Sequence, residues 1–156
     1  MLVGSSPRRV AVIGGSRIPF ARAHGAYASV GNQQMLTASL KAVVDKFALK
    51  GVRLGDVVAG AVMKHSSQWN LTRESLLDSG LSPETPGLDV QRACGTSIEA
   101  AIIVANKIAL GQIDAGLAGR RPLGCTPAVA LGASYVYMRL RAHRARSFGE
   151  RVAPFL

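Results

Sequence analysis

Residues 96–110 form the segment that most constrains how this chain can fold. Apolar side chains recur there at helical spacing, and further apolar residues occupy the remaining faces. These residues are Ile98, Ala101, Ile102, Ala105 and Ile108 on one face, and Ala100, Ile103 and Val104 on the others. Thr96 or Ser97 can cap the start of such a helix, and Gly111 can end it. A helix that is apolar nearly all round is usually buried between layers, so the chain needs a layered architecture.

Apolar strands and helices alternate along the rest of the first 119 residues. We expect strands at Arg9–Gly15, Val57–Val62, Leu88–Gln91 and Ala115–Ala118. We expect an amphipathic helix over about 33–48, and a short one over 72–79 that is closed by Gly80. A continuous β-branched run, such as the first of these strands, suits a strand that is covered on both faces. The alternation predicts an α/β fold with a mostly parallel sheet.

Length and composition fit one ordinary domain with a real hydrophobic core. The chain has 156 residues, of which 48% are hydrophobic and 5% aromatic. No apolar run is long enough to span a membrane. The apolar stretch after Arg8 and Arg9 is too short for a signal peptide, so we expect a cytoplasmic protein. In such a protein, two cysteines without a paired framework are expected to be reduced.

The positive charge is concentrated at the end of the chain. Residues 1–119 carry 12 Lys and Arg against 8 Asp and Glu, a net charge of +4. Residues 120–156 carry 7 Arg against a single acid, Glu150, which contributes +6 to the total of +10. This segment shows no clear alternation of strands and helices. We therefore divide the chain into a domain over 1–119 and an Arg-rich tail over 120–156, which we expect to be poorly ordered.

Cys94 lies between the short strand and the apolar helix, with Gly95 directly after it. The N-terminus of a helix carries unpaired N–H groups and a positive dipole, which favour the reactive thiolate form of a nearby cysteine. Gly95 leaves room for close approach, and its N–H could help to hold an anion. The residues alone leave two interpretations open. Cys94 is either a nucleophile or a small buried hydrophobic residue, which is the commoner role of a free cysteine.

Four segments resemble the thiolase family, and they follow its order and spacing from about residue 8 to residue 119. They are Arg17–Phe20 (RIPF), the stretch containing Gly60, Asn70 and Arg73, the nucleophile segment Val90–Ser97 (VQRACGTS), and Gly111–Gly119 (GQIDAGLAG). The chain is most similar to the thiolases of fatty-acid β-oxidation, which are acetyl-CoA C-acyltransferases.

The resemblance implies a partial thiolase-like N-terminal domain of the α/β class, in which a buried helix follows the nucleophile Cys94. Cys94 would attack the keto carbon of a 3-ketoacyl-CoA, release acetyl-CoA and keep the shortened acyl group until a second CoA accepts it. The reverse reaction would condense two acyl-CoA units. CoA and acyl-CoA would thus be substrates, with no tightly bound cofactor. The complete enzyme would be a homo-oligomer.

The resemblance covers only the first part of a thiolase, which is much longer and contains two similar α/β halves. Its base is a histidine in a Gly-His-Pro turn, and none of His24, His65 and His143 has that context. Cys125 lacks the glycines that surround the second cysteine of the family. We therefore expect negligible turnover by the chain alone. We also expect it to expose apolar helix faces and open strand edges, which favour aggregation.

The similarity breaks after Gly119, where Arg120, Arg121 and Pro122 replace the expected glycine and acidic segment. An abrupt change to Arg-, Ala- and Pro-rich sequence is typical of a GC-rich gene that is read out of frame. We therefore expect residues 120–156 to come from a frameshift.

Two other functions stay open from the sequence. The tail could bind nucleic acid through its spaced arginines with Tyr135 and Tyr137, although a charge run without a binding motif is more often a solvated tail. The chain could also associate with an intact thiolase subunit and regulate it, because its apolar faces favour association. No metal-ligand cluster is visible in the sequence.

Overall fold

The structure is a computed structural model that describes residues 7–22, 25–62, 64, 68–120 and 147. Its elements are α1 (Asn32–Lys46), β1 (Asp56–Ala59), α2 (Leu71–Ser79), β2 (Gly87–Asp89), the 3-10 turn η2 (Ala93–Gly95), α3 (Thr96–Ala109) and β3 (Gly116–Ala118). This order confirms the predicted α/β alternation, with slightly shifted bounds. Apart from Arg120 and Ser147, the Arg-rich tail lies outside the described residues. In the described part, no helix has the length and apolar character required to cross a membrane.

The three strands form one parallel sheet in the order β2–β1–β3. In the central strand β1, Val57 pairs with Gly87 of β2 on one side and with Leu117 of β3 on the other. Because parallel strands cannot be joined by a hairpin, each connection is a crossover. The connection from β1 to β2 contains α2, and the connection from β2 to β3 contains α3. The prediction of a mostly parallel sheet is confirmed.

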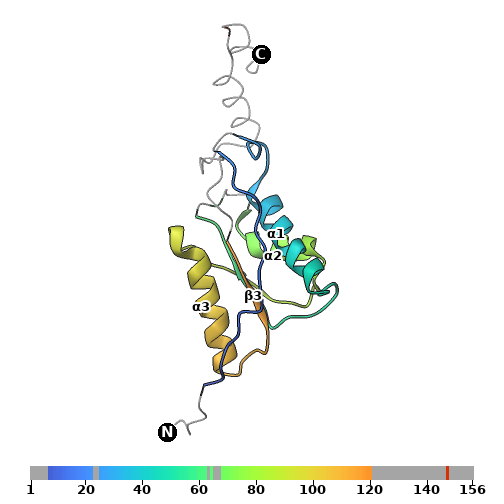
Figure 1. Ribbon diagram of the computed structural model, residues 1–156, viewed down its shortest axis with the longest axis vertical. Coiled ribbons are helices and arrows are strands. Elements are labelled where there is room, and N and C mark those ends of the chain that lie inside the picture. Colours follow the sequence, from blue (N-terminus) through green and yellow to red (C-terminus); the bar gives the residue numbers. More distant parts are fainter. Residues whose placement is uncertain (1–6, 23–24, 63, 65–67, 121–146, 148–156) are drawn as a thin grey trace.

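The helices cover both faces of this sheet. Figure 1 shows α1 and α2 on one side and α3 on the other. Val57 and Ala59 pack with apolar side chains of α1 and α2, whereas Val58 packs with Ala100 and Val104 of α3. Successive side chains of a strand point to opposite faces, so a strand that is covered on both faces must be apolar throughout. This requirement explains the apolar run Val57–Ala59 in β1. Asp56, which begins the strand, is buried as well and forms an ion pair with Lys107 of α3.

Local interactions explain where the helices begin and end. At the start of α1, the N–H of Gly31 donates to Oε1 of Gln34 at 2.9 Å, which satisfies a backbone group just outside the helix. At the end of α2, Gly80 adopts a left-handed conformation with φ of 91°. Glycine reaches this conformation without a steric penalty, which confirms the predicted end of the helix at Gly80.

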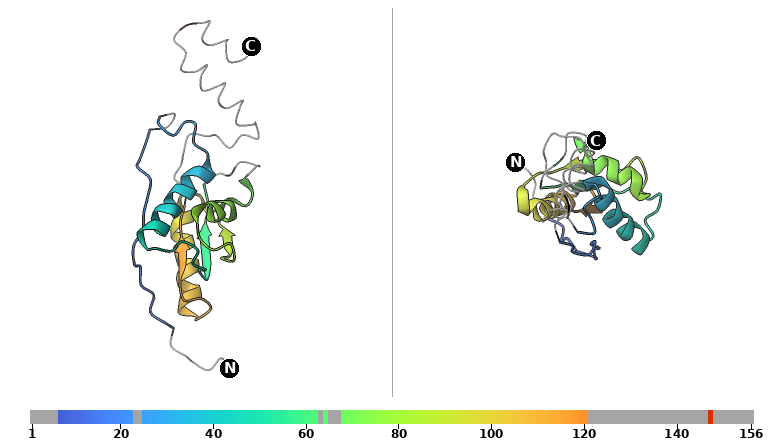
Figure 2. Two further views of the ribbon diagram at one scale, coloured as in Figure 1. Left: turned by 90° about the vertical axis from the view of Figure 1, so that its right-hand side faces the viewer. Right: turned by 90° about the horizontal axis from the view of Figure 1, so that it is seen from above.

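The strand predicted at Arg9–Gly15 is wrong, because residues 7–22 form no helix or strand. Val12 and Ile13 are 95% and 84% exposed, so neither is covered. The segment is tied to helices instead: the N–H of Arg8 donates to the carbonyl of Ala109 at 2.9 Å, and Nζ of Lys46 donates to the carbonyl of Gly15 at 3.5 Å. Figure 2 shows it as an extended trace outside the layers. A β-branched run becomes a strand only beside a ladder partner, and none of the three described strands pairs with it.

α3 is buried on one face only, whereas the sequence predicted a helix buried between layers. Thr96, Ala100 and Val104 are buried, while Ile98 and Ile102 are 67% and 47% exposed. The apolar pattern shows that both faces of α3 are apolar. It does not specify what covers the outer face, which contains Ile98 and Ile102. The exposure expected of an incomplete domain is therefore confirmed for this helix.

Gly60 lies where the end of β1 approaches the segment that leads to Cys94. A Cβ atom at Gly60 would lie 1.9 Å from the carbonyl oxygen of Val90, which is too close for any side chain. The N–H of Val90 donates to the carbonyl of Ala59 at 2.9 Å and holds the two segments together. Only glycine fits at this position, which gives a structural reason for the glycine that the sequence analysis singled out.

The substitution Gly60→Ala is expected to lower the free energy of unfolding by about 2 kcal/mol, because the backbone of Val90 must move away from β1. Gly15→Ala is the matched control, since nothing lies within 4 Å of a Cβ atom placed there. Its effect should stay within about 0.5 kcal/mol. Urea denaturation of the two variants measures the difference, and equal stabilities would contradict the close approach at Gly60.

Candidate functional site

Cys94 lies on the 3-10 turn that joins the segment after β2 to α3, and its side chain is exposed. This exposure rules out the interpretation of Cys94 as a small buried hydrophobic residue in this structure. The carboxyl end of β2 and the amino end of α3 meet at this turn. Ligands of open α/β proteins commonly bind at this end of a parallel sheet, which makes the turn the candidate site.

The side chain of Thr96 holds the turn together through two hydrogen bonds. Its Oγ1 accepts a hydrogen bond from the N–H of Arg92 at 2.9 Å and donates to the carbonyl of Ala93 at 2.8 Å. Thr96 is fully buried, so these bonds satisfy a hydroxyl group that water does not reach. Sequence analysis proposed Thr96 or Ser97 as the cap residue of α3. In the structure the cap position is Gly95, and Thr96 is the first residue of the helix.

The N–H of Gly95 is not available to hold an anion as predicted, because it donates to the carbonyl of Arg92 at 2.9 Å. The prediction that Gly95 leaves open space beside Cys94 is confirmed. A Cβ atom at this position would meet nothing nearer than Cγ of Arg92 at 4.0 Å, so the space beside the turn is open.

Ala93, directly before Cys94, has a left-handed backbone with φ of 44°. For a residue that carries a Cβ atom this conformation costs about 1–2 kcal/mol. The hydrogen bonds of the turn must hold the residue in place against this cost. Nothing in the sequence signals the conformation, because alanine has no preference for it.

Two arginines lie at the turn. Arg92 forms an ion pair with Glu99 in the first turn of α3. Nη1 of Arg120 donates to the backbone carbonyl of Cys94 at 2.9 Å. Sequence analysis assigned Arg120 to the tail, so its position beside the candidate nucleophile is a finding of the structure. Its guanidinium places a positive charge at the turn that local sequence did not reveal.

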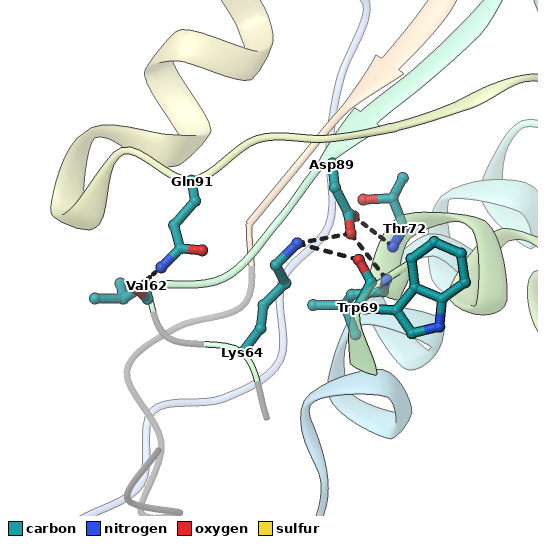
Figure 3. Close-up of polar contacts among 7 residues, drawn as sticks. Val62, Lys64, Trp69, Thr72, Asp89 and Gln91 are labelled. Carbon is teal, nitrogen blue, oxygen red and sulfur yellow. Dashed lines mark hydrogen bonds and ion pairs between the residues drawn. The ribbon is translucent and has the colours of Figure 1, made fainter. Parts of the chain in front are cut away.

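Asp89 is a further residue of this region that sequence analysis missed (Figure 3). Its Oδ1 accepts from the N–H of Thr72 at 2.7 Å, and its Oδ2 accepts from the N–H of Leu71 and from Nζ of Lys64, both at 2.9 Å. Lys64 also donates to the carbonyl of Trp69 at 3.3 Å. The partners are distant in sequence from Asp89, so no local motif could identify the cluster.

The other residues of the family-like segments have local roles in this structure. Nη1 and Nη2 of Arg73 donate to the carbonyls of Thr85 and Pro83, both at 2.7 Å, and so shape the turn before β2. Asn70 directly precedes α2 and makes no side-chain capping bond. The guanidinium of Arg17 lies 4.5 Å from the centre of the Phe20 ring.

The remaining candidates for chemistry cannot be assigned a place. His24, His65, His143 and Cys125 all lie outside the described residues. Within the described ranges, no group of three or more His, Cys, Asp and Glu side chains is arranged to hold a metal ion.

The substitution Thr96→Val is expected to lower the free energy of unfolding by about 1–2 kcal/mol, because the N–H of Arg92 loses its acceptor and the carbonyl of Ala93 loses its donor. Thr72→Val is the matched control: Thr72 is equally buried, but its Oγ1 has no hydrogen-bond partner. Its replacement should therefore leave stability unchanged or raise it slightly. Chemical denaturation monitored by circular dichroism compares the two. If both variants lose the same stability, the bonds of Thr96 do not hold the turn.

Comparison with known proteins identifies one family over most of the chain. The family model described as "Thiolase, N-terminal domain" matches residues 10–120. The 3-ketoacyl-CoA thiolase of Shewanella halifaxensis is 28% identical over 147 residues, which are 94% of this chain and 34% of the relative. The 3-ketoacyl-CoA thiolase of Shewanella woodyi is 29% identical over 147 residues, again 94% of this chain and 34% of the relative. The chain thus spans about a third of the length of these curated relatives.

A solved structure gives the same result for the fold. The crystal structure of the acetyl-CoA acetyltransferase of Bacillus anthracis superposes with a TM-score of 0.70 over 75% of this chain and 30% of that chain. The sequence identity is 21%, so this likeness concerns the fold alone. The family match covers most of the chain and includes β1 to β3 with the turn of Cys94. The chain therefore belongs to the thiolase family, and the part of that family it matches is the N-terminal domain.

Proposed function

We propose that this chain supplies the nucleophile of a thiolase-type acyl transfer and that the nucleophile is Cys94. The observation that carries the proposal is the exposed thiol on the turn that begins the 14-residue helix α3, in a chain of the thiolase family. The thiolate is the attacking form of cysteine, and the exposed position leaves the sulfur of Cys94 accessible to a substrate. The names of the two Shewanella relatives support a 3-ketoacyl-CoA as the substrate.

The proposed reaction divides one difficult transfer into two easier ones. The sulfur of Cys94 bonds to the keto carbon of the 3-ketoacyl-CoA. The bond between the keto carbon and its neighbour on the CoA side then breaks, and the departing carbon takes up a proton, so acetyl-CoA leaves. A second CoA loses its thiol proton to a base, and its thiolate attacks the acyl-cysteine and takes the acyl group. The Cys94 thiolate leaves and takes up that proton, which restores the thiol. This chemistry belongs to fatty-acid breakdown or, in the reverse direction, to condensation of acyl-CoA units.

The cycle needs a base that generates and resets the thiolate, and it needs donors for the developing oxyanion. Gly95 does not supply such a donor here, because its N–H is bonded to Arg92. Sequence analysis found no histidine in the Gly-His-Pro context of the family. We therefore propose that the chain acts only together with the rest of a complete thiolase, as a cytoplasmic homo-oligomer with CoA and acyl-CoA as substrates and no tightly bound cofactor.

The outer face of α3 supports association with further protein. Ile98 and Ile102 lie one helical turn apart and are both exposed, which forms an apolar stripe on the surface. Association with an intact thiolase subunit is therefore a second candidate function. Co-purification of the tagged chain with a full-length relative tests it, and a chain that is recovered only by itself contradicts it.

The purified chain alone is expected to cleave no acetoacetyl-CoA above the background rate, because none of its three histidines has the Gly-His-Pro context of the family's base. The assay follows the loss of the ketoacyl-CoA in the presence of CoA. Turnover that depends on protein concentration, and that Cys94→Ala abolishes, would show that this chain is sufficient.

A chimera tests the role of Cys94 directly. Residues 7–119 replace the matching part of the 3-ketoacyl-CoA thiolase of Shewanella halifaxensis, and cleavage of acetoacetyl-CoA is measured. Activity is expected, and Cys94→Ala should reduce kcat by about a thousandfold or more. Asp114→Asn is the control, because Asp114 is exposed and pairs only weakly with Arg8 across the surface. An active Cys94→Ala chimera would overturn the assignment.

The frameshift expected after Gly119 stays a prediction. The family model ends at residue 120, whereas the Shewanella relatives match 147 residues and so extend beyond the first 119. Reading the gene across codon 119 in all three frames provides the test. A frame that resumes a glycine-rich, acidic segment and later encodes Gly-His-Pro supports the frameshift, and its absence from every frame contradicts it.

A further inference from the structure

The carboxylate of Asp89 joins three segments of the chain at one point. Asp89 ends β2, Lys64 belongs to the loop after β1, and Leu71 and Thr72 form the first turn of α2. The side chains of Asp89 and Lys64 are 14% and 20% exposed, so this ion pair is largely withdrawn from water. Both carboxylate oxygens accept hydrogen bonds within 2.9 Å, which compensates the charge for the loss of water.

Asp89 also takes the place of a local cap on α2. Asn70, in the cap position, makes no side-chain bond to the helix. The N–H groups of Leu71 and Thr72 bond to Asp89 instead, and a negative charge at a helix N-terminus is favourable. The start of α2 and the end of β2 therefore depend on the same carboxylate.

The segment from Asp89 to Cys94 is held from two sides. On the side of β1, the N–H of Val90 donates to the carbonyl of Ala59 at 2.9 Å, and Nε2 of Gln91 donates to the carbonyl of Val62 at 3.1 Å. On the side of α2, Asp89 accepts hydrogen bonds from the N–H groups of Leu71 and Thr72. Figure 3 shows Asp89 and Gln91 reaching to different segments from the same stretch of chain. The turn that carries Cys94 begins at Ala93, two residues after Gln91.

We propose that Asp89, held by Lys64, is a positioning residue for Cys94. It fixes the path of the backbone between β2 and α3 and so sets where the thiol lies relative to the N-terminus of α3. The proposal rests on the proposed role of Cys94 as the nucleophile. Asp89 has no contact with reacting atoms in this role and acts only through the intervening backbone.

The test measures alkylation of Cys94 by iodoacetamide in the full chain. Cys125→Ser leaves Cys94 as the single thiol, and mass spectrometry gives the rate constant from neutral to alkaline pH. In this background, Asp89→Asn and Lys64→Met remove one partner each. Asp114→Asn is the control, because it removes a carboxylate from an exposed ion pair at a different place. Denaturation curves confirm that each variant is folded under the assay conditions.

Asp89→Asn is expected to slow alkylation at neutral pH by about fivefold and to change the pH dependence of the rate, because the thiol leaves its place at the helix N-terminus. Lys64→Met should change the rate in the same direction, and Asp114→Asn should have no effect. A general loss of stability would not alter the pH dependence of a folded variant.

A folded Asp89→Asn variant with the alkylation profile of the parent chain would overturn the proposal. If that variant does not fold, Lys64→Met decides in the same way, and an unchanged profile again overturns it. Alkylation requires only the thiol and no turnover. Failure of the positioning role is therefore distinct from failure of the proposed acyl transfer, which the chimera tests.

Discussion

The burial of β1 on both faces is the constraint on which the rest of the structure depends. Val57, Val58 and Ala59 have no exposed surface, so helices must cover both sides of the sheet, and β2 and β3 must occupy both edges. The end of the same strand meets the segment that leads to Cys94, at a contact that only Gly60 permits. The central strand therefore helps to fix the path of the backbone that leads to the candidate nucleophile.

Around Cys94 the chain combines an exposed side chain with a tightly held backbone. Thr96 forms hydrogen bonds within the turn, and Val90 bonds the segment before the turn to β1. Asp89 bonds the same segment to α2. This network holds Ala93 in a left-handed conformation that it would not adopt in isolation. A side chain on a rigid turn is held in position through its backbone. The backbone that carries the proposed nucleophile is therefore fixed, although the side chain itself is exposed.

Most of the fold could be predicted because it depends on local pattern. The three helices, the strands β1 to β3 and the stop at Gly80 follow from apolar periodicity and from residues that begin or end helices. The run at Arg9–Gly15 could not be judged this way, since a strand requires a neighbour that its own residues do not specify. The same limit applies to the site. The segment around Cys94 is enough to propose Cys94 as the nucleophile, whereas Asp89 and Arg120 gain their positions only through the tertiary fold.

The parallel order of the strands also determines how the domain assembles as the chain leaves the ribosome. β1, α2 and β2 are consecutive, so they can dock together once Asp89 has emerged. At that stage Val58 faces water and one edge of β1 has no partner. The stage ends only when α3 has been synthesised and Ala100 and Val104 cover Val58, after which β3 closes the edge. A nascent chain of this domain therefore exposes its central strand until the helix that follows the turn of Cys94 is complete.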